Sequence, residues 1–128
     1  MARMGARLGL TRYEADEYYR MALSHYQKNN LEEAINNINL ALELFPNRAE
    51  YYATRGLFRL EDGLPEQAEA DFDAALVRNA YDMLANYGKG TIFFQREDYE
   101  AALQFFTKAW AALPNRVENA LLSNLYVC

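Results

Sequence analysis

A constant spacing of 34 residues relates three segments of this chain, and this spacing limits the chain to a narrow class of folds. Two sets of alanines repeat at this interval, namely Ala34, Ala68 and Ala102, and Ala41, Ala75 and Ala109. Large apolar residues recur between the two sets, at Ile38, Phe72 and Phe106. A period of this length is typical of a stacked repeat array, in which each unit buries its apolar side only against its neighbours. Such arrays act through their shape and exposed surface, which argues against an enzyme.

Each period has the pattern of a helix, a tight turn and a second helix. In the first unit, apolar residues recur every three or four positions from Tyr18 to His25, and again from Leu31 to Phe45. Asn29 lies between the two stripes. We expect it to end the first helix, because asparagine tolerates the left-handed conformation found at helix ends. Pro46 then stops the second helix. We therefore predict three helix pairs over residues 15–48, 49–82 and 83–116.

The two ends of the chain are treated separately. Residues 1–14 form either a flexible tail or an extension of the first helix. Residues 117–128 have the pattern of one further helix, which would cap the last pair. The predicted fold class is thus an all-α, right-handed superhelical solenoid of three repeats with a C-terminal capping helix.

Composition excludes several classes of function. The net charge of −5 repels phosphate backbones, so we expect no nucleic-acid partner. No apolar run is long enough for membrane insertion. The single cysteine, Cys128, cannot form an internal disulfide, and a reducing, cytoplasmic location is expected.

The repeat strongly resembles the tetratricopeptide repeat family over residues 15–116. The matching positions across the three units include Tyr18, Ala22, Ala34, Ile38, Ala41 and Pro46, then Tyr52, Gly56, Ala68, Phe72 and Ala75, then Gly90, Tyr99, Ala102, Phe106, Ala109 and Pro114. The chain departs from the family pattern at three positions. Ala80 replaces a proline, Asn86 replaces a large aromatic residue, and Glu97 stands where glycine is usual.

The resemblance implies a concave groove lined by the first helix of each unit. The candidate peptide-binding residues at these positions are Tyr19, Leu23, Tyr26, Leu57, Leu60, Leu84, Tyr87, Thr91 and Phe94. This set is apolar and aromatic for a surface that faces solvent, which is typical of a contact site. We expect a protein or peptide partner with an apolar or amphipathic segment, and Tyr19, Tyr26, Tyr87 and Phe94 are the preferred contact residues.

One variant of the family grips a C-terminal carboxylate with lysine, arginine and asparagine in this groove. The equivalent positions here are Tyr19, Leu23, Thr54, Leu84 and Gly88, and none of them is a cation. The sequence therefore argues against recognition of chaperone tails by that mechanism. A weaker resemblance links the groove to small bacterial secretion chaperones of three such repeats.

The C-terminal segment supplies an alternative function. Its apolar residues form a candidate homo-oligomer interface, namely Leu121, Leu122, Leu125 and Tyr126. The chain would then be a structural self-assembly unit, and a further alternative is an accessory fragment of a larger protein.

No residue set in the sequence indicates catalysis, a metal or a cofactor. The only histidine, His25, lies at a position that packs between helices and has no ligand partner nearby in the sequence. Arg55 and Arg59 lie on the inward stripe of the second unit, where we predict an ion pair with Asp71. The acidic residues Glu32, Glu33, Glu43, Glu66, Glu69 and Asp73 are expected on a solvated convex face.

Overall fold

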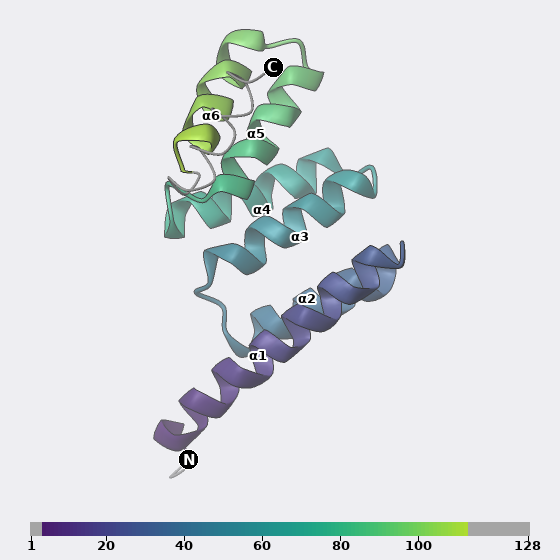
Figure 1. Ribbon diagram of the computed structural model, residues 1–128, viewed down its shortest axis with the longest axis vertical. Helices are drawn as coiled ribbons and strands as arrows, with labels where there is room; N and C mark the ends of the chain where they lie inside the picture. Colours follow the sequence, from purple (N-terminus) through teal and green to yellow (C-terminus); the bar gives the residue numbers. More distant parts are fainter. Residues whose placement is uncertain (1–3, 113–128) are drawn as a thin grey trace, which may run out of the picture.

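The computed structural model describes the backbone of residues 4–112 and the side chains of residues 11–112. These residues form six α-helices and no strand, with the bounds α1 Met4–Gln27, α2 Leu31–Leu44, α3 Ala49–Glu61, α4 Pro65–Arg78, α5 Met83–Gln95 and α6 Tyr99–Ala111. Each odd-numbered helix pairs with the even-numbered helix that follows it, and the three pairs stack in chain order (Figure 1). The predicted all-α repeat solenoid is confirmed. None of the helices described is both long and apolar enough to span a membrane.

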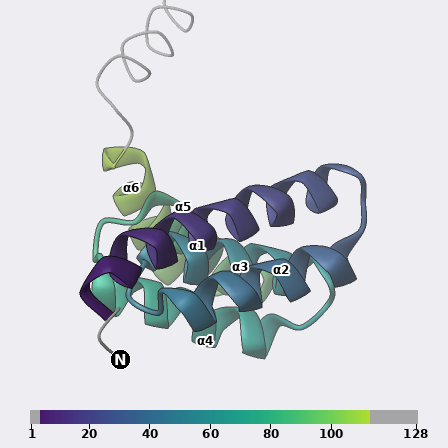
Figure 2. The ribbon, with the colours of Figure 1, turned by 90° about the horizontal axis from the view of Figure 1, so that it is seen from below.

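The two ends of the chain differ in what the structure describes. For residues 1–14, it shows helix from Met4 onward, so α1 extends well beyond the first repeat (Figure 2). The predicted capping helix, at residues 117–128, lies outside the described residues.

The turn within each repeat has a positive φ angle at the same position. These angles are 62° at Asn29, 77° at Gly63 and 63° at Glu97, and the three residues are 34 positions apart. Glycine and asparagine adopt this conformation readily, whereas it costs other residues about 1–2 kcal/mol. The turn at Glu97 is therefore kept in spite of its residue type, because the packing of the helix pair fixes the backbone there.

Polar caps fix the first turn of three helices. The side chains of Asn30, Asp82 and Asp98 accept hydrogen bonds from backbone N–H groups at the starts of α2, α5 and α6. Pro65 opens α4, where its missing N–H group leaves no hydrogen bond unmade. The starts of α2, α4, α5 and α6 are thus encoded by residues close to them in the sequence.

Phe72 of α4 packs between Gly56 of α3 and Gly88 of α5, so its ring contacts both the second and the third repeat. A Cβ atom added at Gly56 would lie 2.6 Å from the Phe72 ring, and one added at Gly88 would lie 2.2 Å from it. The ring is fully buried. Glycine inside a helix costs about 1 kcal/mol relative to alanine, so its presence in α3 and α5 reflects this close approach.

The departures from the family pattern at Ala80 and Asn86 compensate one another. Asn86 is buried, and its side-chain amide donates to the backbone carbonyl oxygens of Ala80 at 3.1 Å and Asp82 at 2.9 Å. The amide therefore holds the connection between α4 and α5 at the place where the family pattern has a proline.

Candidate functional site

The predicted groove residues of α1 contact the next repeat. The Tyr19 ring lies 5.2 Å from the Tyr51 ring, and its hydroxyl group lies 3.2 Å from the hydroxyl of Thr54. The Tyr26 ring stacks on Phe58 at 5.0 Å. Both tyrosines are partly buried, so they join the first repeat to the second and leave only part of each ring accessible.

Burial and a hydrogen bond to a carboxylate raise the pKa values of these two tyrosines. Burial raises the pKa of Tyr19 above its ordinary value. The Tyr26 hydroxyl donates to the Glu61 carboxylate at 3.0 Å, and this hydrogen bond raises the pKa of Tyr26. Both phenols therefore stay protonated further into the alkaline range than an ordinary tyrosine.

The other predicted groove residues, one on α1, two on α3 and two on α5, are also partly buried. Leu23 packs against the core of the first repeats, and Leu60 and Leu84 pack against the second core. Leu57 and Thr91 are partly buried as well, and the Thr91 hydroxyl donates to a backbone oxygen of its own helix at 3.0 Å. These five residues therefore expose only part of their side chains.

Tyr87 and Phe94 on α5 are the groove residues that the fold leaves most open. Tyr87 is 54% exposed and Phe94 is 56% exposed. Each touches one neighbouring ring of α6, Phe106 at 5.7 Å for Tyr87 and Tyr99 at 5.3 Å for Phe94. Of the four aromatic residues preferred as contacts, these two present the larger free surface.

The junction of the first two repeats, at the edge of the predicted groove, carries carboxylates. Asp16 accepts from the Tyr51 hydroxyl at 2.5 Å and from Arg48 at 3.3 Å. Arg48 also lies 3.8 Å from Glu50, which is exposed. Burial raises the pKa of Tyr51, and the hydrogen bond to Asp16 raises it further. Two carboxylates thus share a single arginine here, and the edge keeps acidic character.

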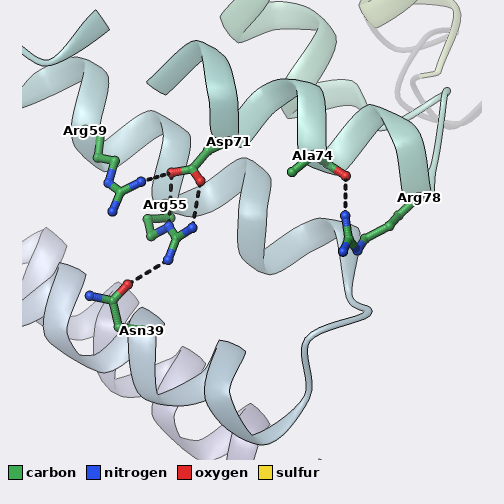
Figure 3. Close-up of polar contacts among 6 residues, drawn as sticks. All are labelled: Asn39, Arg55, Arg59, Asp71, Ala74 and Arg78. Atoms are coloured by element: carbon green, nitrogen blue, oxygen red, sulfur yellow. Dashed lines mark hydrogen bonds and ion pairs between the residues drawn. The ribbon is translucent and has the colours of Figure 1, made fainter. Parts of the chain in front are cut away.

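A buried ion-pair cluster joins α3 to α4. Asp71 accepts two hydrogen bonds from Arg55, at 2.8 Å and 3.0 Å, and one from Arg59 at 2.9 Å (Figure 3). Asn39 of α2 accepts a further bond from Arg55 at 2.9 Å. The predicted pairing is confirmed, and the cluster also reaches the first repeat.

The third repeat has different residues at the positions of the Arg55, Arg59 and Asp71 cluster. Lys89 occupies the position of Arg55, is buried, and lies 3.0 Å from Glu69 and 2.9 Å from Asp73. Both acidic residues were expected on a solvated face. Asp73 is exposed there, whereas Glu69 is partly buried, and α5 brings Lys89 across to pair with both. At the positions of Arg59 and Asp71, the rings of Phe93 and Phe105 stack at 5.5 Å.

The ion pairs around Lys89 shift the pKa of Glu69 and the pKa of Lys89 itself. A hydrogen bond from Arg96 at 2.8 Å, together with Lys89, lowers the pKa of Glu69. Burial alone would lower the pKa of Lys89, but the hydrogen bonds to Asp73 and Glu69 outweigh it and raise the pKa. Both pKa shifts favour the charged forms of Glu69 and Lys89.

An apolar pocket of about 580 Å³ lies at the end of the third repeat, between α5 and α6. We call it the terminal pocket, and it is lined by Met83, Leu84, Tyr87, Phe106, Ala109 and Trp110. Trp110 is 43% exposed. The sequence did not identify this pocket, because its lining residues come from both helices of the pair.

The structure gives no sign of a metal centre among the residues that it describes. No group of three or more histidine, cysteine, aspartate and glutamate side chains there could hold an ion. His25 is partly buried near the end of α1.

Three helix pairs stacked in chain order define a helical repeat protein. Family models described as tetratricopeptide repeat match residues 15–48 and residues 54–117. The chain belongs to the tetratricopeptide repeat family. A search of curated proteins finds no match.

Solved structures support the same fold. The second TPR of Spaghetti (RPAP3), bound to the HSP90 peptide SRMEEVD, is 18% identical with a TM-score of 0.76, over 84% of this chain and 99% of that one. The Arabidopsis OM64 TPR domain is 23% identical with a TM-score of 0.74, over 81% and 86%. MamA is 18% identical with a TM-score of 0.70, and the match covers 84% of this chain but only 63% of the MamA chain. At these identities the likeness concerns the fold.

Proposed function

We propose that this chain is a non-catalytic protein-interaction module that binds an apolar or amphipathic segment of a partner protein in its groove. The observation that carries the proposal is the exposure of Tyr87 and Phe94, two large aromatic residues seven positions apart on α5. Seven residues make about two helical turns, so both rings lie on one face of the helix. Aromatic residues bury much area with few torsions to freeze, which makes an exposed pair a good anchor for a partner.

Charge at the groove favours a partner with basic flanks. Glu50 and Glu61 are exposed at the junction of the first and second repeats, where Arg48 links Glu50 to Asp16 and Glu61 accepts a hydrogen bond from Tyr26. A segment with lysine or arginine beside its apolar residues would meet complementary charge there, whereas an acidic segment would be repelled.

The carboxylate-gripping mechanism has no support at the corresponding positions. Thr54 is buried and bonded to Tyr19, and Gly88 has no side chain and lies against the Phe72 ring. The HSP90 peptide seen with the Spaghetti domain ends in an acidic sequence, Glu-Glu-Val-Asp. We therefore propose a different class of segment for this chain.

Selection from a displayed peptide library, followed by binding assays with two variants, tests the proposal. The double variant Tyr87→Ala, Phe94→Ala is expected to lower the binding affinity for the selected peptides roughly 30-fold or more. Hot-spot residues contribute about 2 kcal/mol or more to the binding free energy. The matched control is Val77→Ala, Tyr81→Ala, which removes two exposed apolar side chains away from the groove. Equal binding by both variants would refute the groove as the binding site.

The alternative functions remain predictions. Self-association through Leu121, Leu122, Leu125 and Tyr126 rests on residues beyond those that the structure describes. Sedimentation analysis over a range of protein concentrations tests it, and a strict monomer would reject it.

A further inference from the structure

We propose that one basic side chain of the partner segment, an arginine or a lysine, binds in a pocket between the ends of α1 and α3. We call it the corner pocket. It has a volume of about 300 Å³ and is lined by Tyr26, Asn29, Leu31 and Glu61. The inference rests on the proposed function, because it gives a place to one residue of the segment that the groove would bind. It adds where along the groove the positive charge of that segment lies.

The walls of the corner pocket match the two parts of a basic side chain. The Tyr26 ring and Leu31 are partly buried and offer apolar surface to the hydrocarbon stem. Glu61 is exposed and supplies a carboxylate for the charged head, and Asn29 adds a neutral acceptor. The Tyr26 hydroxyl donates to the Glu61 carboxylate at 3.0 Å, which holds that carboxylate beside the ring.

Glu61 differs from the other two carboxylates at the junction of the first two repeats. Asp16 and Glu50 share Arg48. Among the side chains that the structure describes, Glu61 forms no ion pair and accepts its hydrogen bond from Tyr26. A cation of the partner would therefore gain a counter-charge at Glu61 without breaking an ion pair of the fold.

The charge around the corner pocket also favours a cation. Residues 28–33 and 61–62 include one cationic side chain, Lys28. The carboxylates in the same two stretches are Glu32, Glu33, Glu61 and Asp62. Both α1 and α3 end here, and the C-terminus of a helix carries partial negative charge. The start of α2 lies here as well, but Asn30 caps it and the two glutamates of its first turn offset its positive end.

The next junction between repeats lacks this arrangement. The equivalent positions there, 34 residues later, are Leu60, Gly63, Pro65 and Gln95. None of them is a carboxylate or a hydroxyl. The corner pocket is therefore a feature of the first junction and is not a general product of the repeat pattern.

The position of the corner pocket sets a register for the partner. Phe94 has the position in the third repeat that Tyr26 has in the first. Packed helices lie about 8–10 Å apart, so α1 and α5 are separated by roughly 16–20 Å across α3. An extended segment covers this distance in about five or six residues, at about 3.3 Å per residue. We therefore expect the basic residue about five or six positions from the apolar residue that contacts Phe94.

Peptides selected from the displayed library test the inference through one change on each side of the contact. Glu61→Gln removes the charge of the protein and keeps an oxygen that can accept from Tyr26. Replacing the basic residue of the peptide by glutamine removes the charge of the partner. Each change alone is expected to lower the affinity about five-fold, the size of an exposed ion pair. The second change should then have little further effect once the first has been made.

The matched control is Glu32→Gln, which removes an exposed carboxylate of the same corner that does not line the pocket. We expect this control to lower the affinity by no more than about two-fold, because salt screens charges that are not in contact. Circular dichroism checks that both variants are folded. The peptide substitution is measured on the wild-type protein, so it tests the contact even if Glu61→Gln does not fold.

Two sets of outcomes separate this inference from the proposed function. Peptides that depend on Tyr87 and Phe94 but contain no basic residue would overturn the inference and leave the proposed function standing. Equal effects of Glu61→Gln and Glu32→Gln, or an affinity that does not change when the basic residue of the peptide is replaced, would do the same. Binding that is unchanged in the Tyr87→Ala, Phe94→Ala variant would refute the proposed function, and the inference would fall with it.

Discussion

Removal of the Asp71 carboxylate is the most direct test of how the second repeat is held together. The side chain is 4% exposed and accepts from both Arg55 and Arg59. Asp71→Ala leaves the two guanidinium groups close together without their shared counter-charge. Because Asp71 lies on α4 and the arginines lie on α3, the variant loosens the helix pair itself.

The magnitude follows from the surroundings of the two arginines. Breaking a buried ion pair by removing one partner costs about 3–5 kcal/mol. Arg55 keeps its bond to Asn39, and both arginines reach solvent to some extent, so we expect about 2–3 kcal/mol here. In a domain of this size, that loss corresponds to a fall of about 10 °C in the melting temperature.

The assay is thermal unfolding followed by circular dichroism, with Asp73→Ala as the control. Asp73 also pairs with a cation, Lys89, but it is exposed and Lys89 keeps Glu69. We expect about 0.5 kcal/mol for this control. An unchanged melting temperature for Asp71→Ala, or a larger effect of Asp73→Ala, would refute the reasoning.

Two further predictions concern packing and pH. Gly88→Ala would place a Cβ atom 2.2 Å from the Phe72 ring and should destabilise the fold by about 1–3 kcal/mol in urea unfolding. In Gly63→Ala the added Cβ atom meets no atom within 4 Å, so the only cost comes from the positive φ angle. The opposite ranking of the two variants would contradict the packing argument. The second prediction concerns Glu69, whose folded pKa lies below the ordinary value of 4.5 chiefly through the hydrogen bond from Arg96. Its stabilisation is therefore complete above pH 4.5 and is lost as the pH falls through the lowered folded pKa. Unfolding free energies measured across this range should fall less steeply in Glu69→Gln, and identical profiles would show that the carboxylate contributes nothing.

Much of the local structure could be predicted from the sequence, because its signals lie close together along the chain. The three-to-four spacing of apolar residues gives the helices, and Asn29 and Gly63 mark two of the turns. The pairing of Arg55 with Asp71 could also be predicted, since both residues fall on the facing sides of one helix pair.

The candidate site was harder to predict, because it depends on how one repeat sits against the next. Tyr19 and Tyr26 have the residue type of contact residues, but the fold uses much of their surface to hold α3. Tyr87 and Phe94 have the same position in the repeat and remain more than half exposed. The position of a residue within the repeat is therefore not enough to predict how exposed its side chain is. The neighbouring residues that pack on that side chain decide this.

The sequence alone determined the repeat length, the helix pairs and their order, because a 34-residue period with apolar stripes can bury its surface only by stacking. Only the tertiary structure decided the contacts between repeats: Lys89 lies between Glu69 and Asp73, and Asn86 holds the carbonyl of Ala80. These contacts depend on the rotation and separation of neighbouring helix pairs. Those quantities are set by the whole packed interface, including the Phe72 ring between two glycines, and no local pattern encodes them.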